Sequence, residues 1–199
     1  MNNYSNRTNL KLKIPKKISR QTLSDAALRY LARYSTSRAN FFRVMMRRVK
    51  SSASYYNTSI EEGKDIVKDL TEYYTKTGVL DDKRFVEAQL HSYKFRGISL
   101  RVIRTKLTNK GVSLKIVDEV LKGRIHSNSC FDLQAAFIFS KKRKLGPFRE
   151  SLQSQINNNG KDLAKLARAG FDYKIAKKII HLQSVEELEE MVESKFRCK

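Results

Sequence analysis

The chain of 199 residues carries 41 lysines and arginines against 20 aspartates and glutamates, which gives a formal net charge of +21. Such an excess of one sign opposes a compact state by self-repulsion and accelerates association with a polyanion. It therefore favours a nucleic acid or a nucleoprotein as the binding partner. The two cysteines, Cys130 and Cys198, are far apart in the sequence and lack the clustered ligands of a zinc site.

The sequence contains no apolar run near the roughly 20 residues that cross a bilayer, and its polar N-terminus lacks the apolar core of a signal peptide. An anionic membrane surface would attract the charge, but we find no basic amphipathic helix with a large apolar face. We therefore expect a cytoplasmic monomer that has no membrane partner and keeps its thiols reduced.

The first segment, residues 1–22, is polar and basic without a sustained apolar period, which predicts a flexible N-terminal arm. Ser24 and Asp25 are favourable N-cap residues, so the first helix is expected to begin there. A Ser-Thr-Ser turn at residues 35–37 should end it. The second helix then carries apolar side chains at helical spacing on one side, at Phe42, Met45, Met46 and Val49.

The rest of the first repeat, which is expected over residues 23–78, contains one loop and one further helix. Residues 51–58 have the composition of a turn and are predicted to form a loop. Ser59, which is followed by glutamates, predicts a capping box at the start of the third helix. Gly78 is expected to end that helix, because glycine adopts the left-handed conformation at low cost.

The second repeat, expected over residues 79–123, is divided by glycines into three helices. Asp81 and its neighbour Asp82 should cap the first helix, and Gly97 should end it. The second helix is expected to end at Gly111, and a third should follow. Each helix carries apolar residues at intervals of three or four positions, which is typical of one buried face.

A third repeat is expected over residues 131–182. Asp132 is predicted to cap its first helix, and Pro147 is predicted to occupy a first helical position. The Asn-Asn-Asn-Gly sequence at residues 157–160 is typical of a turn. Asp172 should then cap the last helix of the repeat.

No segment has the alternating pattern of a strand, so the fold class is predicted to be all-α. Residues 111–121 align with residues 170–180, apolar position for apolar position. This similarity predicts three tandem three-helix repeats that form an elongated, curved molecule, since so small a unit must stack to bury its apolar face. Residues 183–199 would add a C-terminal helix, capped by Ser184, and a tail.

The sequence offers no arrangement of residues for catalysis. His91, His126 and His181 are scattered, and none lies at metal-ligand spacing from another. P-loop, HExxH, GxSxG and GxGxxG motifs are absent from the sequence. We therefore expect a binding protein that is not an enzyme and that uses no cofactor and no metal.

Basic residues recur on the second helix of each expected repeat and in the turn before it. Cations at equivalent places in stacked repeats would form a stripe that can follow a phosphate backbone. The alternative is an ordinary solvated face that is rich in lysine and arginine. We take the stripe as the candidate surface for single-stranded and double-stranded DNA; its residues are Arg43, Arg47, Arg48, Lys94, Arg96, Arg101, Arg104, Lys106, Lys141, Lys142, Arg143, Lys144 and Arg149.

Several segments resemble the RecX family, whose members regulate the bacterial recombinase RecA. The resemblance is carried, in chain order, by residues 27–33, 37–39, 78–88, 97–112, 144–149 and 162–170. The most specific of these is Gly-Val-Leu-Asp-Asp-Lys-Arg-Phe-Val-Glu-Ala at residues 78–88. The last two segments are similar to a longer variant found in alphaproteobacterial members, and the whole resemblance extends over about residues 24–182.

This resemblance implies a curved protein of tandem three-helix repeats that lies in the helical groove of the filament formed by RecA on single-stranded DNA. Proteins of this family limit filament growth there and inhibit strand exchange, ATP hydrolysis and cleavage of the SOS repressor. The family is not catalytic and provides no single invariant residue to transfer. The stripe of cations therefore remains the proposed contact surface.

The sequence departs from the short members of the family at residues 51–58 and in an insertion at residues 150–160, and the N-terminal arm lies outside the match. One alternative function is a general nucleic-acid-binding helical protein without a recombinase partner, such as a helix-turn-helix protein. Another is a helical scaffold that binds only protein. The scaffold predicts little dependence of binding on salt, whereas counterion release from DNA predicts much.

Overall fold

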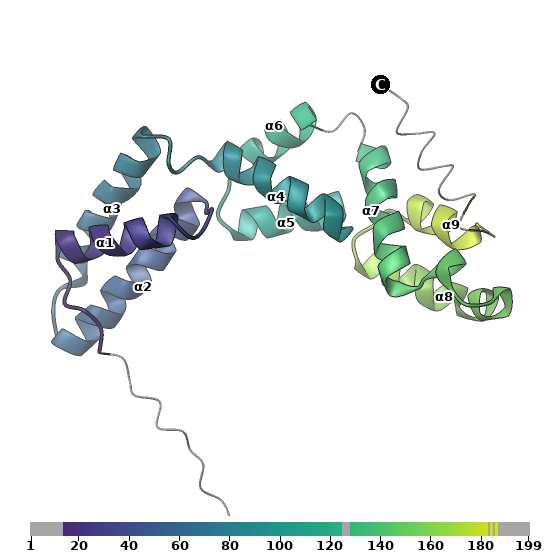
Figure 1. The fold of residues 1–199 in the computed structure, drawn as a ribbon, viewed down its shortest axis with the longest axis horizontal. Helices are drawn as coiled ribbons and strands as arrows, with labels where there is room; N and C mark the ends of the chain where they lie inside the picture. The colour runs from purple at the N-terminus through teal and green to yellow at the C-terminus, as the bar shows by residue number, and fades with distance from the viewer. Residues whose placement is uncertain (1–13, 125–127, 183, 185, 187–199) are drawn as a thin grey trace, which may run out of the picture. The chain divides into compact units, whose positions relative to one another are not determined.

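The computed structural model describes residues 14–124, 128–182, 184 and 186, and within these ranges the chain is helical and has no strand. This confirms the all-α prediction. Nine α-helices follow one another in the described part of the chain, three in each repeat (Figure 1). They are α1 (Arg20–Leu31), α2 (Arg38–Tyr56), α3 (Ile60–Lys76), α4 (Asp82–Arg96), α5 (Leu100–Asn109), α6 (Leu114–Arg124), α7 (Asn128–Arg143), α8 (Leu152–Arg168) and α9 (Tyr173–His181), with a short 3-10 helix at Gly146–Phe148.

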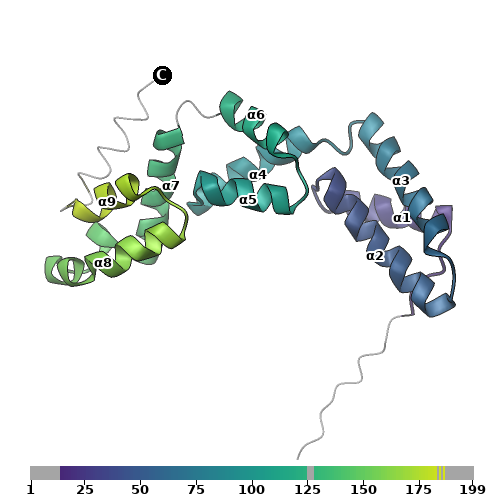
Figure 2. The same ribbon diagram turned by 180° about the vertical axis from the view of Figure 1, so that it is seen from behind.

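The described residues belong to two compact units. The first contains the chain up to Ser35 and Asn40–Leu80, and the second contains Thr36–Ala39 and the chain from Asp81 onward. The first unit therefore holds repeat 1 (α1–α3), and the second holds repeat 2 (α4–α6) and repeat 3 (α7–α9). Helices α1 and α3 of the first unit lie side by side in both views, as do α8 and α9 of the second (Figure 1, Figure 2).

The core of the first unit is built from one apolar face of each helix. Leu23 of α1, Phe41 and Met45 of α2, and Val67 of α3 are at most 1% exposed. Phe41 and Met45 are about one helical turn apart, so both side chains lie on the same side of α2. Burying one side chain of this size contributes roughly 2 kcal/mol to stability. The packed face, rather than the propensity of each isolated helix, therefore holds the unit together.

Repeats 2 and 3 share one continuous apolar core. Ile103 of α5 and Val117 of α6 belong to the same cluster as Ala136 of α7 and Leu166 of α8, and all four side chains are fully buried. Helix α4 of repeat 2 also packs against α7 of repeat 3. Stacking of the two repeats therefore buries apolar surface that a single three-helix unit would leave in water.

Two hydrogen bonds join repeat 2 to repeat 3 at the N-terminus of α5. Ser99, the residue before this helix, donates from Oγ to the carbonyl oxygen of Ala169 over 2.8 Å. The main-chain N–H of Leu100 donates to Oδ1 of Asp132 over 2.8 Å. The prediction that Asp132 caps its own helix is wrong: α7 begins at Asn128, and Asp132 caps α5 of the neighbouring repeat instead.

The second unit contains the same pair of bonds once more. In the segment Thr36–Ala39, Ser37 Oγ donates to the carbonyl oxygen of Lys110, and the N–H of Arg38 donates to Oδ1 of Asp82 over 2.9 Å. Ser37, like its counterpart in the first pair, is fully buried. We name this recurring arrangement the repeat joint: a serine hydroxyl bonds to a main-chain carbonyl, and the next main-chain N–H bonds to an aspartate.

Gly97 ends α4, as expected, and also allows this end of the helix to approach α7 closely. Its φ of +69° is in the left-handed region, and a Cβ placed on it would lie 2.7 Å from the main-chain nitrogen of Phe139 and 2.8 Å from the carbonyl oxygen of Ala135. Gly78 has a similar φ of +73°, but no atom would lie within 4 Å of its Cβ. A substitution at Gly78 would therefore meet backbone strain alone, whereas one at Gly97 would meet backbone strain and steric overlap.

Replacing each of these glycines by alanine should measure the two effects. Gly78→Ala is expected to lower the free energy of unfolding by about 1 kcal/mol through its left-handed backbone alone. Gly97→Ala should cost clearly more, because the new methyl group would overlap main-chain atoms of α7. Urea unfolding of both full-length variants measures the difference, and equal losses would contradict the close approach at Gly97.

The first helix begins earlier than the sequence interpretation placed it. α1 starts at Arg20 because Ser19 and Thr22 form a reciprocal capping box, with the N–H of Thr22 donating to Ser19 Oγ over 3.1 Å and the N–H of Ser19 donating to Thr22 Oγ1 over 2.9 Å. The prediction of an N-terminal arm is therefore wrong for residues 20–22. Residues 1–13 of that arm lie outside the described part of the chain.

The loop predicted for residues 51–58 is wrong for most of its length, because α2 continues to Tyr56. Ser52 and Ala53 are buried. Their small side chains, which are typical of a turn, therefore pack inside the unit. Asn57 then follows the helix in the left-handed conformation, with a φ of +52°. This leads to Ser59, whose hydroxyl caps α3 by accepting from the N–H of Glu61 over 3.2 Å. The predicted cap is thus confirmed, but α3 does not have the reciprocal glutamate bond of the predicted capping box.

The turn predicted for residues 157–160 is also wrong, because α8 continues through it. Asn158 donates from its side chain to the carbonyl oxygen of Ser154 over 2.8 Å, so it bonds within the helix instead of opening it. Gln155 is buried and donates from Nε2 to the carbonyl oxygen of Ile180 over 3.1 Å. Contacts with α9 thus hold a polar sequence in helical form.

The other helix ends agree with the sequence interpretation. Asp81 accepts from the N–H of Lys83, and Asp172 accepts from that of Lys174, each over 2.8 Å. Pro147 lies in the first turn of the 3-10 helix. The C-terminal helix predicted for residues 183–199 lies, except at two single positions, outside the described residues.

Candidate nucleic-acid interface

A cavity of about 400 Å³ on the second unit gathers basic side chains from repeats 2 and 3. Five of its ten lining residues are lysine or arginine, and none is acidic. Cations that are concentrated in this way attract phosphate groups. We name this cavity the basic pocket; it is lined by Arg96, Gly97, Ile98, Val102, Lys106, Phe139, Lys142, Arg143, Arg168 and Ala169.

Three helices end at the basic pocket. Arg96, Arg143 and Arg168 are the last residues of α4, α7 and α8. The C-terminus of a helix carries a partial negative charge of about half an elementary charge, so a cation at this place stabilises its own helix. Lys106 and Lys142 add two further charges. The cations therefore exceed what the helix ends neutralise, and the pocket remains positive.

Contacts within the pocket orient its cations. Lys142 Nζ donates to the carbonyl oxygen of Phe95 over 2.9 Å. The guanidinium of Arg143 lies over the ring of Phe139, 5.6 Å from the ring centroid, and Arg168 Nε donates to a carbonyl oxygen of its own helix over 3.2 Å. All five cations are nevertheless exposed to solvent, so they can reach a bound anion.

The basic pocket contains four residues of the stripe expected from the sequence, namely Arg96, Lys106, Lys142 and Arg143. Arg168 was not part of that stripe, although it lies, like Lys106, in the last turn of the second helix of its repeat. Its position just before a helix-ending glycine was the available signal. The remaining stripe residues of this region, Lys94, Arg101, Lys141 and Lys144, are exposed but do not line the pocket.

Carboxylates hold two other residues of the expected stripe. Arg104 Nε lies 2.8 Å from Oδ1 of Asp118, and both side chains are partly exposed. Arg149 donates from Nε and Nη2 to the two carboxylate oxygens of Asp162, each over 2.7 Å. Asp162 is fully buried and Arg149 is 18% exposed. This second pair therefore gives Arg149 a structural role in repeat 3.

The buried carboxylate of Asp162 remains ionised because its partners outweigh its desolvation. Burial alone would raise the pKa of Asp162, but the hydrogen bonds from Arg149 and from the N–H of Gly146, together with the charges of Arg149 and Lys165, lower the pKa below its usual value. The hydrogen bond to Asp162 and the negative charge of that carboxylate raise the pKa of Arg149. Both groups are therefore charged at neutral pH, and they tie the turn before α8 to α8 itself.

Basic side chains also border two cavities of the first unit. One of about 690 Å³ is lined by several apolar residues together with Lys16, Arg29, Arg47 and Arg48. Another of about 620 Å³ is bordered by Arg43 and Arg47, but Glu61 contributes a carboxylate to it. The stripe residues expected in repeat 1 therefore lie beside cavities, and the first of these has no acidic residue in its lining.

The described part of the chain has two further properties that bear on function. No helix within it is long and apolar enough to cross a membrane. Nor do its histidine, cysteine and acidic side chains come together in any group of three or more that could bind a metal ion. Cys130 is half-buried, and its Sγ accepts from the side chain of Gln134 over 3.7 Å.

Similarity to known proteins identifies the family. The regulatory protein RecX of Myxococcus xanthus is 38% identical to this chain over 168 residues, which cover 84% of the chain and 89% of that protein. The chain belongs to the RecX family. The regulatory protein RecX of Agrobacterium fabrum is 32% identical over 113 residues, 57% of each chain. No family model matches the sequence, and no solved structure matches it.

The extent of the RecX match includes both compact units. The 168 residues aligned with the Myxococcus protein exceed the length of either unit, so neither unit accounts for the similarity by itself. The helical repeats and the pocket between repeats 2 and 3 are therefore features of a RecX protein, not of an unrelated domain fused to one.

Proposed function

We propose that this protein binds the filament that RecA forms on single-stranded DNA and limits filament growth, ATP hydrolysis, strand exchange and cleavage of the SOS repressor. The observation that carries the proposal is the basic pocket, where five exposed cations converge without an acidic neighbour in its lining. Membership of the RecX family supplies the recombinase as partner.

The charge distribution supports a contact with the DNA of the filament. Binding of cations to phosphates releases condensed counterions, which favours association most at low salt. The net charge of +21 also accelerates the encounter with a polyanion. We place the DNA contact at the basic pocket and extend it to the exposed stripe residues of the same helices, with Arg149 left out because Asp162 holds it.

The test is the ATPase activity of RecA on single-stranded DNA in the presence of this protein at far less than one copy per RecA. If the protein blocks filament growth, ATP hydrolysis should fall strongly at these low ratios, because one bound molecule stops the addition of many RecA subunits. The same protein added to fully grown filaments should act more slowly.

A general nucleic-acid binder remains the second candidate function, because cations that contact phosphate do not by themselves require RecA. Such a protein would inhibit the ATPase only when it saturates the DNA. Inhibition that scales with the amount of DNA, rather than with the number of growing filament ends, would contradict filament regulation and favour this alternative.

A further inference from the structure

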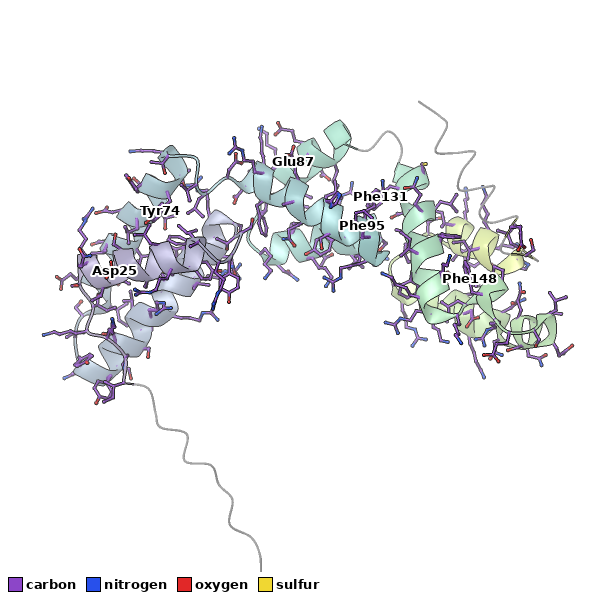
Figure 3. All side chains as sticks on the ribbon, in the orientation of Figure 1. Asp25, Tyr74, Glu87, Phe95, Phe131 and Phe148 are labelled. Carbon is purple, nitrogen blue, oxygen red and sulfur yellow. The ribbon has the colours of Figure 1, made fainter. Side chains whose placement is uncertain are left out.

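Phe95 is an exposed aromatic residue that directly precedes Arg96 of the basic pocket. It lies in the last turn of α4 (Figure 3), and its side chain is 63% exposed. The residue that follows it, Arg96, lines the pocket, and the carbonyl oxygen of Phe95 accepts the hydrogen bond from Lys142, another pocket residue. The backbone of Phe95 therefore adjoins two of the cations that we assign to phosphate.

Packing of the fold does not account for Phe95. The other phenylalanines of the described chain are buried or half-buried, and those of the second unit belong to or pack against its core. Phe95 is outside that core. Leaving so much of an aromatic ring in water forgoes the stabilisation that burial of a side chain of this size would give, and it leaves the ring accessible to a bound molecule.

One neighbouring side chain contacts the ring of Phe95. His91, one helical turn earlier, makes an edge-on contact with it, with ring centroids 4.8 Å apart and an interplanar angle of 66°. His91 is itself exposed. The contact leaves much of the Phe95 ring open to solvent, as a stacking platform requires.

We propose that the basic pocket binds unpaired DNA and that Phe95 stacks on one of its bases while Arg96 and Lys142 contact the adjoining phosphates. Base stacking on aromatic side chains together with a cationic track is how proteins hold single strands without reading their sequence. The bases of a duplex are already stacked and paired, so only a single strand can use Phe95. The inference rests on the DNA contact of the proposed function and names the form of DNA that this site selects.

The experiment compares two oligomers of equal length and equal phosphate number: oligothymidylate and an abasic oligomer without bases. The wild-type protein should bind oligothymidylate more tightly, by about tenfold if one base stacks. Phe95→Leu should abolish this difference and leave the affinity for the abasic oligomer and its salt dependence unchanged. Tyr73→Leu is the matched control, since Tyr73 is 60% exposed on α3 of the other unit.

Each result has a distinct meaning. Equal wild-type affinity for the two oligomers, or a base-dependent difference that persists in Phe95→Leu, would overturn the stacking inference and leave the proposed function in place. Loss of RecA inhibition by Phe95→Leu without any change in oligomer binding would overturn it too and assign Phe95 to a protein contact. Failure of both oligomers to bind would remove the DNA contact itself and, with it, this inference.

Discussion

Reversing the charge of Arg96 and Lys106 is expected to weaken binding to single-stranded DNA by about tenfold or more and to lower the salt slope of log affinity by about 1.4. Both side chains are exposed and line the basic pocket, and neither belongs to the apolar core. Each reversal removes one phosphate contact and places a carboxylate in the path of the backbone. Titration of a labelled oligonucleotide at several salt concentrations measures both quantities.

A matched variant separates this effect from the loss of net charge. Lys115 and Lys122 are exposed on α6, outside the lining of the pocket. Reversing them changes the net charge by the same amount, so Lys115→Glu with Lys122→Glu should weaken binding much less. Equal losses in the two double variants would mean that overall charge, rather than the basic pocket, determines DNA binding.

Asp162→Ala is expected to lower the free energy of unfolding by about 3 kcal/mol, because it leaves the guanidinium of Arg149 without its partner in a mostly buried place. The N–H of Gly146 also loses its acceptor, at present 3.1 Å away. Asp118→Ala is the control: it breaks the partly exposed pair with Arg104 and should cost less than about 1 kcal/mol. Urea unfolding of both variants provides the comparison.

The carboxylate of Asp162 should also make the free energy of unfolding depend on pH. In the unfolded chain the pKa of an aspartate is near 3.9, whereas in the folded protein the pKa of Asp162 is lowered. Its contribution is therefore fully present above about pH 4 and is lost as the pH falls through the lowered folded-state pKa. The stability gap between wild type and Asp162→Ala should narrow on acidification, and a gap that is constant down to strongly acidic pH would contradict the assignment.

The helix ends could be predicted where one residue decides the geometry. Gly78 and Gly97 end helices with a positive φ, and Asp81 and Asp172 cap the next ones. These signals are local, because they depend on the backbone of a few neighbouring residues. The all-α class and the order of the repeats followed from the same signals together with the helical spacing of apolar residues.

The predictions of local structure were wrong where contacts between distant residues override local composition. Gln155 keeps α8 helical through hydrogen bonding to α9, a partner that no sequence window around residues 157–160 contains. Asp132 has the residue type of an N-cap, and it does cap a helix, but that helix is α5. Local sequence patterns identify the kind of hydrogen bond that such a residue can form, whereas the fold determines which group is its partner.

The candidate site was predicted in part for the same reason. Arg96, Lys106, Lys142 and Arg143 were found because cations recur in the sequence on the second helices and in the turns before them, and the structure brings these four together. Composition could not distinguish them from Arg149, which belongs to the same basic stretch but faces a buried carboxylate. Nor could it identify Phe95, because exposure of an aromatic ring depends on packing.

The repeat joint has a consequence for how proteins of this kind change length in evolution. Repeat 2 provides the donors of one joint and the acceptors of another. Its donors are Ser99 and the N–H of Leu100. Its acceptors are the carbonyl of Lys110 and the carboxylate of Asp82. A duplicated copy of its coding segment would therefore encode a repeat that bonds to its own duplicate without any new substitution. Adding or removing one such repeat would therefore leave the hydrogen bonds of every joint complete.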